Sequence, residues 1–144
     1  MRYFTFQNKD IMSAEKVFDI KQHRVSGEAT AFIADCLQID SRYDQKTYKH
    51  LRKALYYLGA LTQFTDDLRD YSDDIEKNNA NLFVSMKNEY GNGARDMYVD
   101  WYIKEEKLMS EEMQKSKLNL DHGLVSCIPW YPYFYNKNLP NSKR

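Results

Sequence analysis

Residues 59–82 read GALTQFTDDLRDYSDDIEKNNANL and place five aspartates within nine residues, from Asp66 to Asp74. The pattern around them predicts one long helix from about Thr47 to about Asn78. Aspartates three or four residues apart meet on a helix surface, and each such like-charge pair costs about 0.2–0.5 kcal/mol. They also fall in the C-terminal part of the expected helix, where the macrodipole favours cations. So dense a carboxylate cluster therefore needs a cause outside the helix itself.

The helical register puts the polar residues of this stretch on one side. At about 100° per residue, four of them lie within about 40° of one line: Gln63, Asp67, Asp70 and Asp74. Apolar residues occupy most of the remaining circumference: Leu51, Leu55, Leu58, Leu61, Phe64, Leu68, Tyr71 and Ile75. Because a helix that is apolar nearly all round is usually buried, we expect the carboxylate stripe to face an internal cavity. The alternative is a solvated acidic helix end.

Carboxylates one turn apart and aimed the same way suit a hard divalent cation. Asp67 and Asp70 have this relationship in the expected helix. Mg²⁺ usually takes one or two carboxylates together with waters and substrate phosphates. The stripe therefore predicts a Mg²⁺ site.

Two family patterns run through the same stretch. The pattern G-x-x-x-Q-x-x-D-D-x-x-D resembles the second aspartate-rich motif of trans-prenyl diphosphate synthases, and its positions here are Gly59, Gln63, Asp66, Asp67 and Asp70. The pattern Q-x-x-x-x-L-R-D-x-x-x-D is similar to a segment of squalene and phytoene synthases, and its positions are Gln63, Leu68, Arg69, Asp70 and Asp74, followed by Asn81 and Leu82. Both groups belong to the class I isoprenoid synthase superfamily. Upstream, Val25, Ser26 and Gly27 are similar to the V-A-G segment of the second group.

The chain also departs from both patterns. Prenyl synthases usually have Phe before the Gln, where this chain has Thr62. The squalene and phytoene branch usually has Asn at the position of Asp66. The resemblance, which spans roughly residues 13–82, therefore leaves the branch undecided.

The resemblance implies Mg²⁺-assisted departure of diphosphate from an allylic prenyl diphosphate, which gives a carbocation for prenyl coupling or terpene cyclisation. It implies four metal ligands, Asp66, Asp67, Asp70 and Asp74, and a catalytic set of Gln63, Asp66, Asp67 and Asp70 in which Gln63 orders the substrate or metal-bound water. Cations beside the cavity would hold the diphosphate oxygens. The candidates are Lys21, Arg24, Arg69 and Lys77.

The earlier aspartate-rich motif of the family, which faces the second across the cavity, has no counterpart here, because the acids from Met1 to Asp44 are isolated. A chain of 144 residues suits one domain, whereas the family fold is a longer single bundle. We therefore expect an all-α, antiparallel helical bundle that corresponds to the C-terminal half of an isoprenoid-synthase fold. We expect it to be inactive alone and to need self-association or a partner chain that supplies the first motif.

Composition narrows the class of protein. Lysine plus arginine and aspartate plus glutamate are each 21, so the net charge is zero and nothing predicts general nucleic-acid binding. No apolar run reaches the ~18–20 residues that span a bilayer, and the start MRYFTFQNKD has no signal-peptide core. Cys36 and Cys127 have no metal-ligand spacing. We expect a cytoplasmic protein with free thiols and no transmembrane segment.

The periodicity predicts one all-helical domain over residues 1–144. Helices are expected at Ala14 to about His23, Glu28 to Leu37, the long segment above, Ala80 to Tyr90 and Ala94 to about Lys117, with a loop at Asp40 to Asp44. In the second of these, apolar residues recur at helical spacing: Ala29, Phe32, Ile33 and Cys36. In the last, the face of Met97, Trp101, Leu108 and Met109 is expected to pack against a core or a partner. Residues 126–144 form an aromatic and proline-rich tail that includes CIPWYPYFY. We expect it to seal the bundle end; the alternatives are a lid over the active site and an interface with the missing half of the fold.

Two hypotheses of other classes remain. The chain could be a noncatalytic helical subunit that completes or regulates a partner. An exposed apolar face and self-association would favour this hypothesis, because a halved bundle leaves core surface to cover. The chain could instead be a plain helical interaction domain whose aspartates form a solvated face, and insensitivity to Mg²⁺ plus pyrophosphate would favour that.

Overall fold

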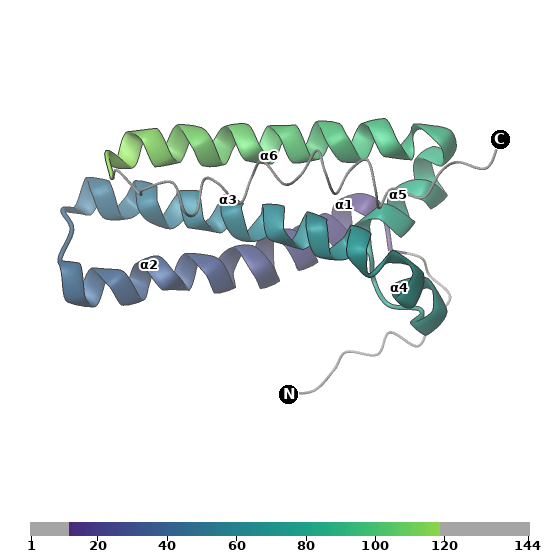
Figure 1. Ribbon diagram of the computed structural model, residues 1–144, viewed down its shortest axis with the longest axis horizontal. Helices are drawn as coiled ribbons and strands as arrows, with labels where there is room; N and C mark the ends of the chain where they lie inside the picture. The colour runs from purple at the N-terminus through teal and green to yellow at the C-terminus, as the bar shows by residue number, and fades with distance from the viewer. Residues whose placement is uncertain (1–11, 119–144) are drawn as a thin grey trace.

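The computed structural model describes residues 12–118, and all regular structure in that range is helical, as expected. In chain order the elements are α1 (Ala14–Val17), the π-helix η1 (Phe18–Gly27), α2 (Glu28–Ser41), α3 (Gln45–Arg69), α4 (Tyr71–Lys77), α5 (Leu82–Tyr90), the 3₁₀-helix η2 (Gly91–Gly93) and α6 (Ala94–Ser116). Figure 1 shows α3 between α2 and α6, and α3 packs against both as well as against η1.

Within residues 12–118 no helix combines the length and the apolar character that a membrane span requires. The expected seal or lid formed by Cys127–Tyr135 lies outside the described residues.

Side-chain caps fix where three of the helices begin. The Asp44 carboxylate accepts hydrogen bonds from the backbone N–H groups of Lys46 and Thr47, both at 3.0 Å, and so starts α3. Asn81 caps α5 in the same way through the N–H of Val84 at 3.2 Å. Ser13 caps α1, as predicted. The helix expected to end at Leu37 continues to Ser41, and the chain reverses at Arg42, which has the left-handed φ of 48°.

The core lies between α3, α5 and α6. Phe64 on α3 is fully buried against the rings of Tyr98 and Tyr102 on α6, with ring centroids 5.0 and 5.6 Å away. The Tyr98 hydroxyl also donates to the Phe64 carbonyl oxygen at 2.5 Å. On the predicted packing face of α6, Met109 is buried and both Met97 and Trp101 pack against the core. The prediction is confirmed for these three residues, whereas Leu108 is half-buried and is not part of this core.

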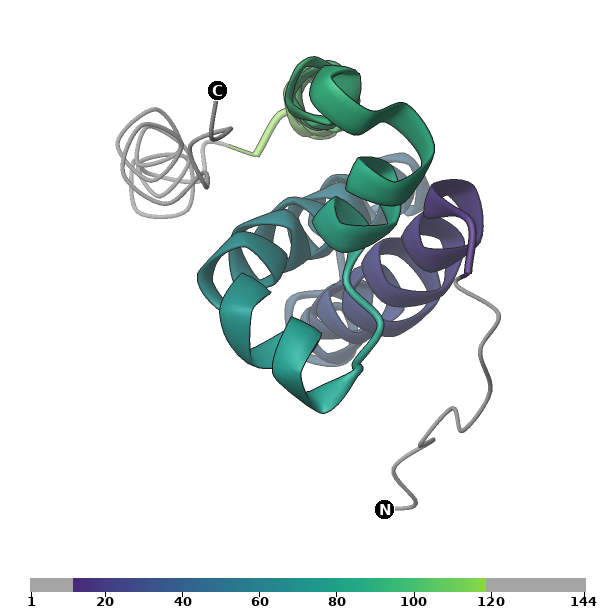
Figure 2. The ribbon, with the colours of Figure 1, turned by 90° about the vertical axis from the view of Figure 1, so that its right-hand side faces the viewer.

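The prediction of one continuous helix from about Thr47 to about Asn78 is wrong at Asp70. There the backbone adopts φ −94° and ψ 9°, and α4 bends away from the line of α3 (Figure 1 and Figure 2). One backbone hydrogen bond lies on each side of the bend, from Asp70 N to Asp66 O at the end of α3 and from Asp74 N to Asp70 O at the start of α4, both at 2.8 Å. Residues 66–74 contain no proline or glycine, the residues that would predict such a bend from the sequence.

Small residues let α3 approach η1 and α2 very closely. A Cβ atom on Gly59 would lie 2.2 Å from the carbonyl oxygen of Ser26 and 2.5 Å from the Thr30 hydroxyl. The facing side of η1 and α2 is equally small, with Gly27, Ala31 and Ala34 all buried. Backbone-to-backbone contact therefore sets the spacing of these helices.

We predict that Gly59→Ala destabilises the fold by about 1–3 kcal/mol, because the added methyl group must displace backbone atoms of η1. Urea unfolding followed by circular dichroism measures this. Gly93→Ala is the control, since its Cβ would meet no atom within 4 Å, and we expect it to stay within about 0.5 kcal/mol of the parent chain. Equal stability of the two variants would contradict the close packing.

Two histidine–glutamate pairs attach α6 to the rest of the bundle. His23 Nε2 lies 3.2 Å from Glu105 Oε2, and His50 Nδ1 lies 2.7 Å from Glu112 Oε2. Glu105 and Glu112 are both buried residues of α6. Burial raises the pKa of Glu112, but hydrogen bonds from His50 and Lys115 outweigh it, so the pKa lies below its ordinary value of 4.5.

Because the folded-state pKa of Glu112 is lowered, its contribution to stability is complete above the unfolded-state pKa and is lost as the pH falls through the folded-state value. Glu112→Gln should therefore cost about 1 kcal/mol near neutral pH, and its difference from the parent chain should shrink below pH 4.5. Unfolding free energies measured across the pH range test this. Glu111→Gln, on the same helix, is the control and should change the stability near neutral pH by less than about 0.5 kcal/mol.

Candidate functional site

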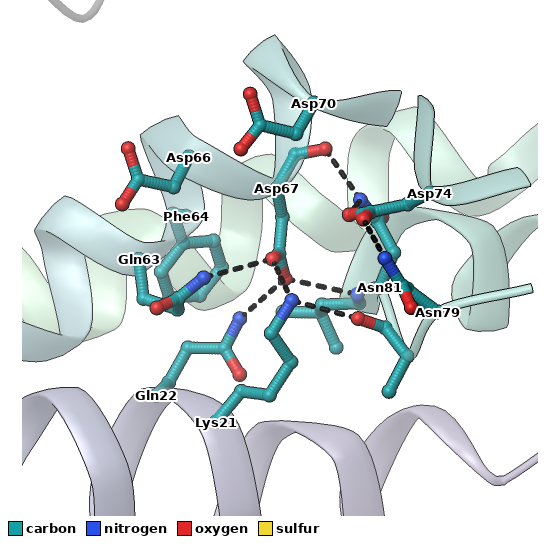
Figure 3. Close-up of polar contacts among 12 residues, drawn as sticks. Lys21, Gln22, Gln63, Phe64, Asp66, Asp67, Asp70, Asp74, Asn79 and Asn81 are labelled. Atoms are coloured by element: carbon teal, nitrogen blue, oxygen red, sulfur yellow. Dashed lines mark hydrogen bonds and ion pairs between the residues drawn. The ribbon is translucent and has the colours of Figure 1, made fainter. Parts of the chain in front are cut away.

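The site is built around Asp67, which is 1 % exposed and lies near the C-terminal end of α3. Four donors from three parts of the chain converge on its carboxylate (Figure 3). They are Lys21 Nζ at 2.5 Å and Gln22 Nε2 at 2.9 Å from η1, Gln63 Nε2 at 3.0 Å from α3, and the backbone N–H of Leu82 at 2.9 Å from the start of α5. One carboxylate thus joins three elements.

The chain before α5 is fixed by the same group of residues. Asn81 Nδ2 donates to the Asp67 backbone carbonyl at 2.6 Å and to Asp74 Oδ2 at 2.9 Å. Asn79 Nδ2 donates to the other Asp74 oxygen at 3.1 Å, and Lys21 Nζ donates to the Ala80 carbonyl at 2.7 Å. These contacts hold α4 and the 78–81 segment against the end of α3.

The electrostatic state of Asp67 follows from its partners. Burial raises the pKa of this carboxyl group above its usual value, and the Lys21 ammonium and the N–H donors offset that rise only in part. All four partners donate, so a protonated carboxyl group would place its own proton against a donor. The ionised form is therefore the one that fits, paired with a Lys21 side chain that is 24 % exposed.

Asp66 and Asp70 have the opposite environment. In Figure 3 their carboxylates project to the side of α3 away from Lys21 and Gln22. Both side chains are close to half exposed, and the Arg69 guanidinium lies 3.0 Å from a carboxylate oxygen of each. The hydrogen bond from Arg69 holds the pKa of Asp70 below its usual value. The expected stripe is thus divided, with Asp67 inside the bundle and Asp70 on its surface.

Only some of the remaining predicted site residues lie next to Asp67 and its neighbouring aspartates. Gln63 belongs to the site, since its Oε1 accepts from Ser26 Oγ at 2.6 Å while its amide nitrogen donates to Asp67. Two candidate cations lie in separate exposed ion pairs, Arg24 with Asp19 at 2.8 Å and Lys77 with Asp73 at 3.4 Å. The structure therefore brings Lys21 and Arg69 to the aspartates and not Arg24.

One participant was missed by sequence reasoning. Gln22 is fully buried, and its Oε1 has no hydrogen-bond partner among the described residues. It sits in η1, a ten-residue π-helix, and π-helical turns are frequent at functional sites. No pattern in residues 18–27 distinguishes a π-helix from an α-helix, so the sequence carried no signal for it.

The donor set can be compared with what Mg²⁺ requires. Across residues 12–118, no three side chains of His, Cys, Asp or Glu are grouped closely enough to hold a metal ion. Asp66 and Asp70, one turn apart, do fit the one or two carboxylates that Mg²⁺ usually takes alongside water and phosphate oxygens. Asp67 fits poorly, because its oxygens are already engaged by four donors.

Comparisons of the chain with protein-family models, curated proteins and solved structures found no match.

We predict that Asp67→Asn destabilises the fold by about 3 kcal/mol, because it leaves the Lys21 ammonium without its counter-charge and sets an NH₂ group against a donor. Chemical unfolding measures the loss. Asp66→Asn, one residue away on the exposed side, should change stability by less than about 1 kcal/mol. If the two variants were equally stable, the buried ion pair would not be what holds these elements together.

Proposed function

We propose that this chain forms one wall of a class I isoprenoid synthase-like site, in which its aspartates hold Mg²⁺ and a prenyl diphosphate. The observation that carries the proposal is the placement of Asp66 and Asp70, whose carboxylates project together from the end of α3 on a solvent-accessible side (Figure 3). The proposal includes an antiparallel half-bundle whose missing metal-binding wall comes from another copy or another chain.

The different environments of the aspartates favour one ligand set over the other. Asp67 is a metal position only in the pattern of the prenyl diphosphate synthases, and here it is buried and saturated. Asp70 and Asp74 are the acidic positions of the squalene and phytoene pattern. The Asp70 carboxylate is about half exposed, whereas both Asp74 oxygens accept hydrogen bonds from Asn79 and Asn81. We therefore assign metal binding to Asp66 and Asp70, with Asp74 as a further ligand or a group that positions them, and we assign Asp67 to positioning.

Each group then has a stated task. Mg²⁺, when bound, would stabilise the charge of the departing diphosphate. Arg69 already lies between Asp66 and Asp70 and would donate to phosphate oxygens there. Gln63 and Lys21 act through Asp67, because they hold that carboxylate and with it the end of α3.

A second candidate function is a noncatalytic helical subunit that completes or regulates a partner. It is favoured by one observation, the large apolar side chains on the outer side of α2. Phe32 is 62 % exposed and Ile39 is 82 % exposed. Such a surface is typical of a helix that packs against another protein.

We expect the thermal unfolding temperature of the purified chain to rise when Mg²⁺ and pyrophosphate are added together, and not with either alone. A ligand at a hundred times its dissociation constant stabilises by about 2.7 kcal/mol. Asp70→Ala should abolish the shift. Asp73→Ala is the matched control, because Asp73 is an exposed aspartate whose ion pair within residues 12–118 is with Lys77, and it should keep the shift.

The outcomes separate the two candidate functions. A parent chain that does not respond to Mg²⁺ plus pyrophosphate, at concentrations where its association state is known, speaks against the diphosphate site and for the noncatalytic subunit. A shift that survives in Asp70→Ala would show that the ligands bind elsewhere.

A further inference from the structure

In α2 the small side chains face the bundle and the large apolar side chains face outward, which is the reverse of an ordinary bundle helix. Its inner side, which packs against α3, carries the small buried residues Ala31 and Ala34. Its outer side carries the large ones, with exposed fractions of 62 % for Phe32, 51 % for Ile33 and 82 % for Ile39. Figure 1 shows α2 at the edge of the bundle, on the far side of α3 from α6. A helix that is apolar on both sides is usually covered on both.

The exposed residues form a regular seam. Val25, in the last turn of η1, and then Ala29, Phe32, Cys36 and Ile39 follow at intervals of four, three, four and three residues, and all five are exposed. This spacing is the a and d pattern of a helix that packs against another helix. The seam is about 21 Å long at 1.5 Å per residue. Its chemistry therefore fits a second helix with the same pattern.

We propose that this seam is the interface of a two-fold symmetric homodimer, in which α2 packs antiparallel against α2 of a second copy. In an antiparallel helix pair, a positions of one helix lie opposite d positions of the other. Phe32 would then lie opposite Cys36 of the second copy, and Ile39 opposite Ala29 of the second copy. Phe32 and Ile39, the two largest side chains of the seam, thus each meet a smaller one, and a two-fold axis repeats each pair.

Charge supports the same orientation. Beside the antiparallel seam, Glu28 of one copy lies near Arg42 of the other, and the symmetry forms this pair twice. The Glu28 side chain is 52 % exposed although Arg52 contacts it, and Arg42 is exposed at the end of α2. In this arrangement the two Asp35 residues lie beside the two-fold axis, where each is balanced by Arg52 of its own copy at 3.1 Å. A parallel pair would instead bring Asp35 close to Asp40 of the second copy, which is unfavourable. Opposite charges across an interface select its register and orientation.

The size of the seam sets the strength of the association. One helix pair of this length buries less than the standard interface of about 800 Å² per partner. We therefore expect a concentration-dependent equilibrium between monomer and dimer. Because the seam is separate from Asp66 and Asp70, dimerisation should occur without Mg²⁺ or pyrophosphate, so its failure and the failure of the proposed function can be told apart.

Sedimentation equilibrium of the full chain under reducing conditions tests the proposal. We expect Phe32→Glu to weaken self-association at least tenfold, because it places a charge in the middle of the seam. Ile103→Glu is the matched control, since Ile103 is a 52 % exposed isoleucine on α6, and it should associate like the parent chain. A parent chain that stays monomeric up to its solubility limit, or a dimer unaffected by Phe32→Glu, overturns the proposal.

Cysteine cross-linking tests the orientation. In a background of Cys36→Ser and Cys127→Ser, the double variant Ala29→Cys with Ile39→Cys should oxidise to a covalent dimer, and Ala29→Cys alone should not. These two positions are ten residues apart on one helix, too far for a bond within one copy. A covalent dimer of the single variant would mean parallel packing and would contradict the proposal. A monomeric parent chain whose Cys36 resists alkylation would mean that another segment of the same chain covers the seam, which also overturns it.

Discussion

Burying the Asp67 carboxylate imposes the strictest requirement in this structure. An ionised carboxylate inside a protein must be matched by donors, and here one donor is a lysine ammonium and another is a backbone N–H at the start of a different helix. Meeting that requirement fixes η1, the end of α3 and the start of α5 relative to one another. The arrangement of α4 and of the segment before α5 then follows through Asn81.

The same requirement explains why neighbouring aspartates have different roles. Asp66 and Asp67 are adjacent in sequence, so they point about 100° apart on the helix. One direction leads into the contact with η1, and the other leads to the surface beside Arg69. A dense acidic stretch is therefore two sets of groups, one that holds the fold together and one that remains available to a ligand.

The sequence predicted the parts of the fold that local chemistry determines. The caps at Ser13 and the glycines before Ala94 set helix limits that the structure reproduces closely. The π-helix, the bend at Asp70 and the burial of Asp67 were not predictable, because each depends on which helices pack together. The apolar spacing of Ala29, Phe32 and Cys36 was visible, but the spacing alone does not tell whether a seam faces the core or the solvent. That was decided by the close contact at Gly59, which brings the opposite side of α2 inward.

The bend at Asp70 has a mechanical consequence. The helical backbone is interrupted there, since α3 ends and α4 begins on either side of Asp70, and the Asp67 carbonyl oxygen accepts from Asn81 Nδ2. The direction of α4 is therefore set less by its connection to α3 than by side-chain contacts, and the hydrogen bond from Asn81 to Asp74 is one of them. The α4 helix is thus a short lever that is hinged at Asp70 and held in place by Asn81. Loss of the hydrogen bond from Asn81 to Asp74 would let α4 and the Asp74 carboxylate move while α3 kept its position.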